Sequence, residues 1–164
     1  MGEALDYNTI TEMNHFYQNI NGFFTWPRLY RDMVKRFPSG SLFVEVGVYE
    51  GQSLAYLIVE VLNSKKKIHI TAVDSFKGNE DRKDNEGLEK RFKDNLKPVF
   101  SKYHLMVGNS TIIAEKYYNE SLDFVFIDAD HTYESVKNDI LAWLPKVKKG
   151  GVIMFDLIPL EINS

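Results

Sequence analysis

The chain has 164 residues, of which 44% are hydrophobic and 26% are charged, and its formal net charge at pH 7 is −3. This composition is typical of one soluble globular domain, and the acidic balance argues against nucleic acid as a partner, because phosphate binding needs a basic surface. The chain has no cysteine, which excludes disulfides, thiolate catalysis and cysteine–zinc sites.

Residues 1–20 lack the apolar core of a signal peptide, and no segment is apolar enough to span a bilayer. We therefore expect a cytoplasmic protein with no membrane partner. Residues 1–24 show no regular period but carry many aromatic side chains, so we interpret them as an N-terminal segment and a candidate lid. Thr25 offers a capping hydroxyl and Pro27 a first-turn proline for the helix that follows. The main domain is then expected at residues 25–164.

Five apolar segments of strand composition alternate with helical patterns along this domain. The strands are expected at residues 41–46, 68–74, 104–107, 122–128 and 152–155. Helices are expected over residues 54–62, 88–98, 109–118 and 133–147, with Asn109 or Ser110 capping the third and Thr132 the fourth. The lysines at 65–67 are interpreted as a solvated turn. This alternation predicts an α/β fold, doubly wound, whose parallel sheet is covered by helices on both faces.

Polar residues follow each predicted strand, and this edge is where parallel sheets bind ligands. The strand ends carry Glu45, Asp74, Gly108-Asn109, Asp128 and Asp156. Any one of these acids has a simpler explanation as a turn former or a helix cap. Together they indicate a site along the carboxyl ends of the strands.

The first strand is followed by Gly47 and Gly51, which allow a tight turn and a close approach of a ligand to the backbone. Amides near Ser53 open the next helix, where partial positive charge favours an anion. The third glycine of a dinucleotide fingerprint is absent, which argues against a pyrophosphate ligand. The carboxylate of Asp74 is suited to accept hydrogen bonds from two ribose hydroxyls. Phe76 is expected either to lie against a nucleobase or to anchor its loop in the core.

The densest cluster of chemical groups lies at residues 126–134, where the fourth strand meets a helix. Asp128 and Asp130, with Asp156 on the neighbouring strand, offer oxygen ligands for a hard divalent ion. Asp130 or His131 is alternatively a base that takes a proton from a substrate hydroxyl. A turn residue beside a helix cap is an equally good explanation of His131.

Five short motifs lie along residues 25–157. They are Glu45-Val46-Gly47 with Gly51-Gln52-Ser53, Val73-Asp74, Gly108-Asn109-Ser110, the run from Asp123 to Tyr133, and Gly150-Gly151-Val152-Ile153. This set resembles the class I S-adenosylmethionine-dependent methyltransferases. Within that class the chain is most similar to the O-methyltransferases grouped with enzymes that modify the sugars of macrolide and aminocoumarin natural products. The resemblance implies a Rossmann-like sheet with strand order 3-2-1-4-5, S-adenosyl-L-methionine as cofactor and a small-molecule hydroxyl as substrate.

By this resemblance the roles of the strand-end residues become specific expectations. The cofactor-binding set is Glu45, Gly47, Gly51 and Ser53 around the methionine portion, Asp74 at the ribose, Asn109 and Ser110 by the adenine, together with Phe76 and Asp128. Relatives usually carry an acid where Asn109 stands. Asp130 matches the base in some relatives and His131 in others.

A magnesium ion is a further expectation of the resemblance, because metal-dependent relatives use an acid such as Asp128 and an acidic pair after the fifth strand. Asp156 fits the first position of that pair, whereas Leu157 occupies the second. The sequence therefore matches the metal-binding pattern only in part.

The family's sheet normally continues through a helix and an antiparallel hairpin after the fifth strand, whereas this chain ends at Ser164. We therefore expect the hairpin of the family to be missing and the fifth strand to be an apolar edge that invites pairing. We expect either a homodimer or an N-terminal segment folded over this edge. Two other functions stay open at this point: a non-catalytic cofactor-binding module, and an oxidoreductase that binds NAD.

Overall fold

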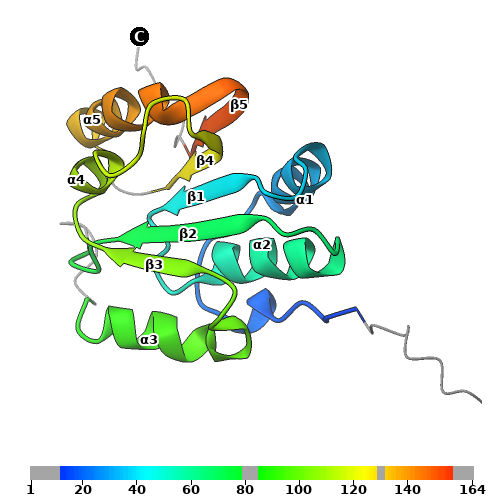
Figure 1. The fold of residues 1–164 in the computed structure, drawn as a ribbon. Helices are drawn as coiled ribbons and strands as arrows, with labels where there is room; N and C mark the ends of the chain where they lie inside the picture. Colours follow the sequence, from blue (N-terminus) through cyan, green and yellow to red (C-terminus); the bar gives the residue numbers. More distant parts are fainter. Residues whose placement is uncertain (1–11, 79–84, 129–131, 157–164) are drawn as a thin grey trace, which may run out of the picture.

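The computed structural model describes residues 12–78, 85–128 and 132–156, which form a three-layer α/β fold around one parallel sheet (Figure 1). The strands are β1 (Leu42–Val46), β2 (His69–Asp74), β3 (His104–Val107), β4 (Leu122–Ile127) and β5 (Val147–Phe155). The helices are α1 (Pro27–Arg36), α2 (Gln52–Asn63), α3 (Leu88–Asn95), α4 (Ser110–Ala114) and α5 (Tyr133–Trp143), with short 3-10 turns η1 (Tyr17–Asn19), η2 (Lys97–Val99) and η3 (Leu144–Lys146).

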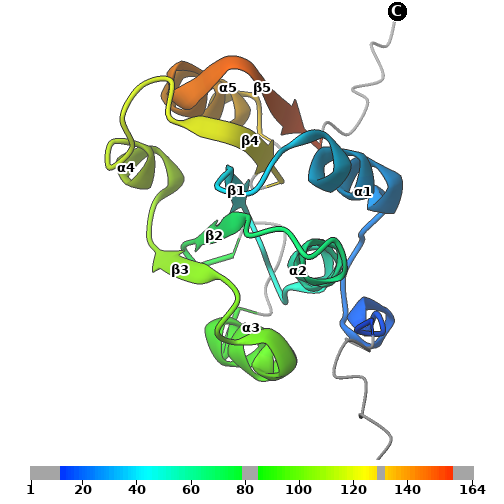
Figure 2. The ribbon, with the colours of Figure 1, turned by 45° about the vertical axis from the view of Figure 1, so that its right-hand side comes forward.

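The sheet has the order β3-β2-β1-β4-β5, and every pair of neighbours is parallel, which confirms the predicted fold class and strand order. Alternate strand residues point to opposite faces, so two apolar clusters form. One cluster joins Phe43, Phe124 and Phe126 to α1, α2 and α3; the other joins Val44 and Val125 to α4 and α5. Figure 2 shows the two groups of helices on opposite sides of the sheet.

The central strands were predictable because both of their faces are largely buried, and β4 shows this most clearly. Residues 122–127 are apolar except for Asp123, and the five others range from 0% to 4% exposed. A parallel strand covered on both faces needs such a continuous apolar run. Among the described residues, no helix is long and apolar enough to cross a membrane.

Several element ends differ from the prediction, and in each case local chemistry explains the difference. The helix expected at residues 88–98 divides into α3 and η2 near Pro98, whose ring cannot continue an α-helix. The helix expected at residues 109–118 is the short helix α4, which ends at Ala114. The strand β5 begins at Val147, five residues early, because the lysine–glycine segment 148–151 bulges opposite Asp123. The two later caps are confirmed as Asn109 and Thr132.

The start of α1 and the turn before β2 were interpreted wrongly. The N-cap of α1 is Trp26, which makes no side-chain capping bond, and not Thr25. Lys66 is not merely part of a solvated turn. Its ammonium donates to the carbonyls of Val34, Lys35 and Phe37 at 2.6, 2.9 and 2.8 Å and so caps the C-terminal end of α1.

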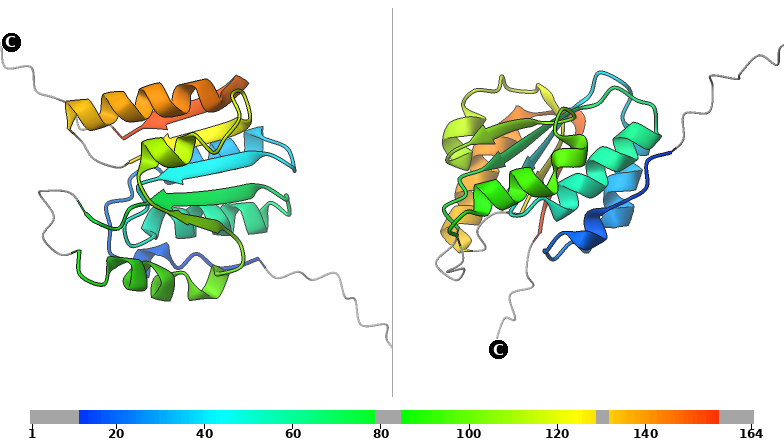
Figure 3. Two further views of the ribbon diagram at one scale, coloured as in Figure 1. Left: turned by 60° about the vertical axis from the view of Figure 1, so that its left-hand side comes forward. Right: turned by 90° about the horizontal axis from the view of Figure 1, so that it is seen from below.

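The N-terminal segment from residue 12 to 24 runs along α2 (Figure 3). At its far end Asn63 accepts from the Met13 amide at 2.8 Å and donates to the Met13 carbonyl at 3.0 Å. His15 lies 2.8 Å from a carboxylate oxygen of Glu60. The expectation that this segment covers the edge of the fifth strand therefore does not hold for residues 12–24, whose hydrogen bonds to other elements are with α2 and whose Phe24 also packs on Tyr30 of α1.

Candidate functional site

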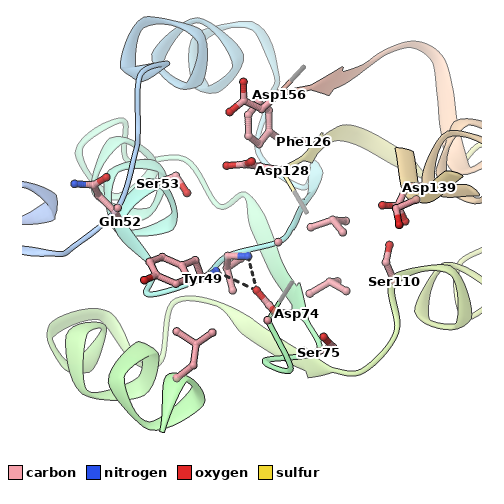
Figure 4. Close-up of a pocket in the computed structure, with 18 of the residues that line it drawn as sticks. Tyr49, Gln52, Ser53, Asp74, Ser75, Ser110, Phe126, Asp128, Asp139 and Asp156 are labelled. Atoms are coloured by element: carbon pink, nitrogen blue, oxygen red, sulfur yellow. Dashed lines mark hydrogen bonds between the residues drawn. The ribbon is translucent and has the colours of Figure 1, made fainter. Parts of the chain in front are cut away.

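A cavity of about 620 Å³ lies at the carboxyl ends of the strands, as expected for a parallel sheet (Figure 4). This volume is within the usual range of about 300–1,000 Å³ for small-molecule sites. Its walls come from four places: the loop 46–49 with the start of α2, the end of β2, the turns into α4 and α5, and the N-terminal segment. The residues that line it include Gly22, Phe23, Trp26, Gln52, Ser53, Asp74, Asn109, Ser110, Phe126, Asp128, Asp139 and Asp156.

The loop after β1 is shaped by the carboxylate of Asp74. One carboxylate oxygen accepts from the amides of Val48 and Tyr49 at 2.9 and 3.0 Å, and the other accepts from Phe76 at 2.8 Å. Gly47 has a φ of +82°, a left-handed conformation that a side chain would strain. Asp74 thus fixes the loop from below, and its side chain also lines the cavity. A carboxylate has about four acceptor positions, so capacity for a ligand hydroxyl remains.

Glu45 lies beneath the cavity, with 1% of its surface exposed. The hydroxyl of Ser53 donates to its Oε1, whereas Oε2 has no hydrogen-bond partner among the described residues. Burial raises the pKa of this carboxyl to about 8, and the Ser53 hydrogen bond opposes the rise. Tyr30 lies close enough to lower this pKa, although its hydroxyl makes no regular hydrogen bond within the described chain. Glu45 is therefore largely protonated at neutral pH.

The first turn of α2 faces the cavity beside this carboxyl. Gly51 precedes the helix with a φ of +92°, and the first three helical amides have no intrahelical acceptor. An anionic group of a ligand would be stabilised at this end by the helix dipole. This geometry agrees with the sequence expectation for the amides near Ser53.

Gln52 ties the N-terminal segment to the start of α2. Its side-chain nitrogen donates to the carbonyl of Ile20 at 2.8 Å, and its oxygen accepts from the amide of Phe24 at 2.9 Å. Gly22 lies so close that a Cβ there would come within 2.8 Å of the Gln52 oxygen. This amide clamp holds Phe23 and Trp26, which are 82% and 45% exposed, at the cavity's rim.

The opposite end of the cavity is formed by the starts of α4 and α5. Asn109 caps α4 through its side-chain oxygen, and the Ser110 hydroxyl accepts from the indole nitrogen of Trp143 at 2.7 Å. Asp139 on α5 is 5% exposed and also lines the cavity. Figure 4 shows its carboxylate and the Ser110 hydroxyl pointing toward one another.

Asp128 and Asp156 follow the neighbouring strands β4 and β5, and Figure 4 places them on one side of the cavity with Phe126. Within the described ranges, no three histidine, aspartate or glutamate side chains gather closely enough to hold a metal ion. The described residues therefore do not form the magnesium site expected from the sequence. Asp130 and His131, the two predicted bases, lie outside the described residues.

The structure brings most of the predicted cofactor-binding residues to the cavity. Gly47, Ser53, Asp74, Asn109, Ser110 and Asp128 all line it, as does Asp156. Glu45 lies one layer deeper, behind Ser53, and Gly51 sets the start of α2. Phe76 is 8% exposed and packs against Phe92, with 5.3 Å between ring centroids. Of the two roles that the sequence left open for Phe76, its position matches the anchor of the loop in the core.

Sequence reasoning did not identify Gln52 and Asp139 as site residues. Gln52 lies inside the glycine motif, but its clamp depends on a segment some thirty residues earlier in the chain. Asp139 lies on the buried face of α5, four residues before Trp143, whereas a carboxylate on a helix ordinarily faces solvent. Asp139 lies six residues after Tyr133, beyond the acid-rich cluster at residues 126–134, so the sequence analysis did not include it.

Comparisons with known proteins concern the family and the fold of the chain. A family model described as a methyltransferase domain matches residues 44–157. The uncharacterised protein R132 of Acanthamoeba polyphaga mimivirus is 29% identical over 127 residues, which are 70% of this chain and 50% of that protein. The chain therefore spans about half the length of this curated relative.

Two solved structures illustrate the shared fold. A candidate caffeoyl-CoA O-methyltransferase from Staphylococcus aureus superposes with a TM-score of 0.60 at 19% identity, over 85% of this chain and 60% of that one. Fibrillarin from Aeropyrum pernix, solved with natively bound S-adenosyl-L-methionine, gives a TM-score of 0.50 at 13% identity, over 77% and 52% of the two chains. At these identities the likeness concerns the fold alone.

Proposed function

The chain belongs to the methyltransferase-domain family, and from this premise we propose that it binds S-adenosyl-L-methionine in the cavity and methylates a hydroxyl oxygen of a small molecule. The observation that carries the proposal is the order of chemical groups along the strand ends. Free helix amides lie at one end beside Ser53, Asp74 lies in the middle, and polar groups of α4 and α5 lie at the other end. An amino-acid carboxylate, a ribose and a nucleobase match that order.

The residues present fit this ligand in three respects. The start of α2 suits a carboxylate. Glu45 presents a buried oxygen without a hydrogen-bond partner directly under the same end, next to Ser53. Asp74 retains acceptor capacity for ribose hydroxyls in addition to its three backbone amides.

The chemistry that S-adenosyl-L-methionine supplies is a methyl group on a sulfonium, a good leaving group, so the protein's task is mostly alignment. A base that removes the acceptor's proton contributes roughly 10²–10⁴-fold. We assign this role to Asp130 first and to His131 second, from their place after β4. Asp128 and Asp156 border the same side of the cavity and are suited to accept hydrogen bonds from acceptor hydroxyls.

The acceptor side is proposed to be completed by the N-terminal segment. The Gln52 clamp holds Phe23 and Trp26 beside the cavity, where exposed aromatic rings provide apolar contact area. In this arrangement the segment at residues 20–26 is a fixed wall for the acceptor. The candidate lid of the sequence analysis would thus act through its last few residues.

The proposal is tested first by ligand binding. S-adenosylhomocysteine is expected to raise the melting temperature of the protein, and NAD is expected to leave it unchanged, since only a ligand of the folded state stabilises it. The reverse result would favour a dinucleotide-binding oxidoreductase. A panel of small hydroxyl compounds with S-adenosyl-L-methionine then tests activity through release of S-adenosylhomocysteine.

Two further measurements separate the remaining alternatives. Stabilisation by S-adenosylhomocysteine without turnover on any acceptor would support a non-catalytic binding module. Once an acceptor is found, Asp130→Asn is expected to lower kcat by at least tenfold while the affinity for S-adenosylhomocysteine changes little. Parallel assays with magnesium and with a chelator test the metal expectation directly.

A further inference from the structure

The amino ends of the strands carry a cluster of cations, on the opposite edge of the sheet from the cavity. We call this cluster the basic edge. It comes from three segments that are far apart in the sequence: the end of α1, the turn between α2 and β2, and the start of β5. Its members are Lys35, Arg36, Lys65, Lys66, Lys67, Lys148 and Lys149. Figure 1 shows α1 and the turn before β2 at the ends of the strands away from the arrowheads.

Hydrogen bonds hold the three segments of the basic edge together. Lys66 donates to three carbonyls at the end of α1, and the amide of Lys67 donates to the hydroxyl of Ser39 at 3.0 Å. The guanidinium of Arg36 donates to the carbonyl of Gly150 at 3.0 Å, in the bulge of β5. The cations of the three segments therefore share one surface.

Few carboxylates balance this charge. Among the described ion pairs, that of Lys148 with Asp123 at 3.2 Å is the one that involves the basic edge, and Glu120, in the turn before β4, forms none with it. In contrast, the described lining of the cavity contains aspartates but no lysine, arginine or histidine. The net charge of −3 is a total over these two ends of the sheet. The sequence expectation against a nucleic-acid partner was based on that total, which conceals the separation.

Lys65 occupies a backbone conformation that does not favour lysine. Its φ is +59°, in the left-handed region where glycine and asparagine are less strained. Its side chain is exposed, and its ammonium has no hydrogen-bond or ion-pair partner within the described ranges. Contacts within the described chain thus give no reason for a lysine here, which indicates a role for its charge toward a partner.

The chemistry of the basic edge matches a phosphate backbone. Lysine binds phosphate as a point charge, and such contacts hold a nucleic acid without reading its bases. The large apolar side chains that are exposed in the described chain lie outside the three segments of the basic edge. A surface that binds membranes ordinarily adds apolar anchors to its cations, so the composition of this surface favours nucleic acid over lipid.

We propose that the basic edge binds the phosphate backbone of a nucleic acid without sequence specificity. The exposed cations make the contacts, whereas Lys66 contributes charge alone, because its three N–H groups are bonded within the chain. The basic edge and the cavity lie at opposite ends of the strands, so the nucleic acid is a docking partner and not the methyl acceptor. This binding does not depend on the proposed methyl transfer.

Fluorescence anisotropy of a labelled DNA duplex of about 20 base pairs, titrated with the protein between about 50 and 200 mM NaCl, tests the proposal. The unmodified protein is expected to bind with a dissociation constant of roughly 10⁻⁴–10⁻⁶ M. Each phosphate that a cation neutralises contributes roughly −0.9 to the slope of log K against log [NaCl], so about four or five contacts give a slope of about −4. A single strand of the same length is expected to bind with a shallower slope.

The triple substitution Lys65→Asn, Lys67→Gln and Lys149→Gln removes three exposed charges from the basic edge. Asparagine tolerates the left-handed backbone at position 65, so the fold is expected to be kept. Duplex binding at low salt is expected to weaken at least about tenfold, and the salt slope is expected to become less negative by roughly 2 to 3.

The matched control is Lys90→Gln, Lys93→Gln and Lys137→Gln, which removes as many exposed lysine charges from α3 and α5, outside the basic edge. Its affinity for the duplex is expected to change less than about threefold, because salt screens charges that do not touch the DNA. The affinity for S-adenosylhomocysteine is expected to be the same in both variants and in the unmodified protein, which checks that the cavity is intact.

Three results would overturn the proposal. One is the absence of duplex and single-strand binding by the unmodified protein at about 50 mM NaCl. Another is equal weakening by the two triple variants, because affinity would then follow total charge and not the basic edge. The third is binding to phosphatidylserine vesicles without binding to DNA, which would assign the surface to a membrane. Failure to bind S-adenosylhomocysteine, with DNA binding as expected, would instead overturn the proposed function and leave the docking surface in place.

Discussion

At the scale of single residues, Asp74 combines a structural and a binding task in one carboxylate. Two of its backbone hydrogen bonds hold the loop after β1, which the ligand must approach closely, and the third holds Phe76 in the loop after β2. Asp74→Asn turns one acceptor oxygen into a donor and breaks at least one of these bonds. We expect about 1–3 kcal/mol lower stability and at least tenfold weaker binding of S-adenosylhomocysteine, measured by urea unfolding and calorimetry.

Asp123 provides a matched control for this substitution. It also accepts a hydrogen bond from a backbone amide, that of Leu42 at 2.8 Å. Asp123 lies at the amino end of β4, however, whereas the cavity lies at the carboxyl ends of the strands. Asp123→Asn is expected to lower stability without changing the affinity for S-adenosylhomocysteine. Equal losses of affinity in the two variants would show that Asp74 acts only through overall stability.

Glu45 predicts a pH dependence of folding. Burial raises its pKa to about 8, above the 4.5 of the unfolded chain, so the folded state holds one more proton between these values. The contribution of Glu45 to stability is then fully present below pH 4.5 and is lost as the pH rises from there through about 8, because ionising this carboxyl in the folded protein is unfavourable. Glu45→Gln keeps the shape and removes the titration. We expect the variant to gain stability over the unmodified protein progressively from pH 5 to pH 8, by a few kcal/mol.

Urea unfolding at pH 5, 6.5 and 8 measures this difference. The control is Glu115→Gln, at the C-terminal end of α4, where the carboxylate is exposed. That variant is expected to follow the unmodified protein at all three pH values. A constant offset between Glu45→Gln and the unmodified protein would mean that Glu45 titrates alike in the folded and unfolded states.

At the scale of elements, the start of α2 connects the cavity to the N-terminal segment through Gln52. Gln52→Ala removes both hydrogen bonds of the clamp, to Ile20 and Phe24. We expect faster amide hydrogen exchange at residues 20–24 and, once an acceptor is known, a severalfold higher KM for it. The affinity for S-adenosylhomocysteine should change less than threefold, because the free amides of α2 belong to the backbone.

Asn63 offers the corresponding control at the other end of the same helix. Its side chain forms an equivalent pair of hydrogen bonds with Met13, far from the cavity. Asn63→Ala should accelerate exchange near residue 13 and leave the acceptor KM unchanged. An increase in KM of the same size in both variants would argue that the segment affects the acceptor only through its general attachment to α2.

At the scale of the whole molecule, the sheet was predictable and parts of the site were not, for a common physical reason. Strands such as residues 122–127 and caps such as Asn109 and Thr132 depend on local composition. The clamp of Gln52 and the burial of Asp139 depend on tertiary neighbours, which no local pattern encodes.

The errors in the sequence analysis have the same origin. Thr25 has the right chemistry for a cap, but the chain enters α1 one residue later. Lys66 has the composition of a solvated turn, yet the fold brings it against the end of α1. In both cases the residue type limits the options and the packing of the fold selects among them.

The edge of the sheet leads us to predict that two copies of the chain associate. The strand β5 lies at that edge, and no described residue pairs with its outer side. The amide of Asp156 donates to Ile127 of β4, and N–H groups alternate along a strand, so the amide of Ile153 points outward. We expect a homodimer that pairs these edges, with twice the 19.0 kDa mass of one chain in light scattering.

The substitution Ile153→Pro should give a monomer, because it removes an outward N–H and leaves the bonds to β4 intact. Ile153→Ala loses most of the same side chain but keeps the N–H, so it should remain dimeric. A monodisperse monomer for the unmodified chain would refute edge pairing. A dimer that survives Ile153→Pro would place the interface on another surface, since edge pairing is the only contact between copies that needs this amide.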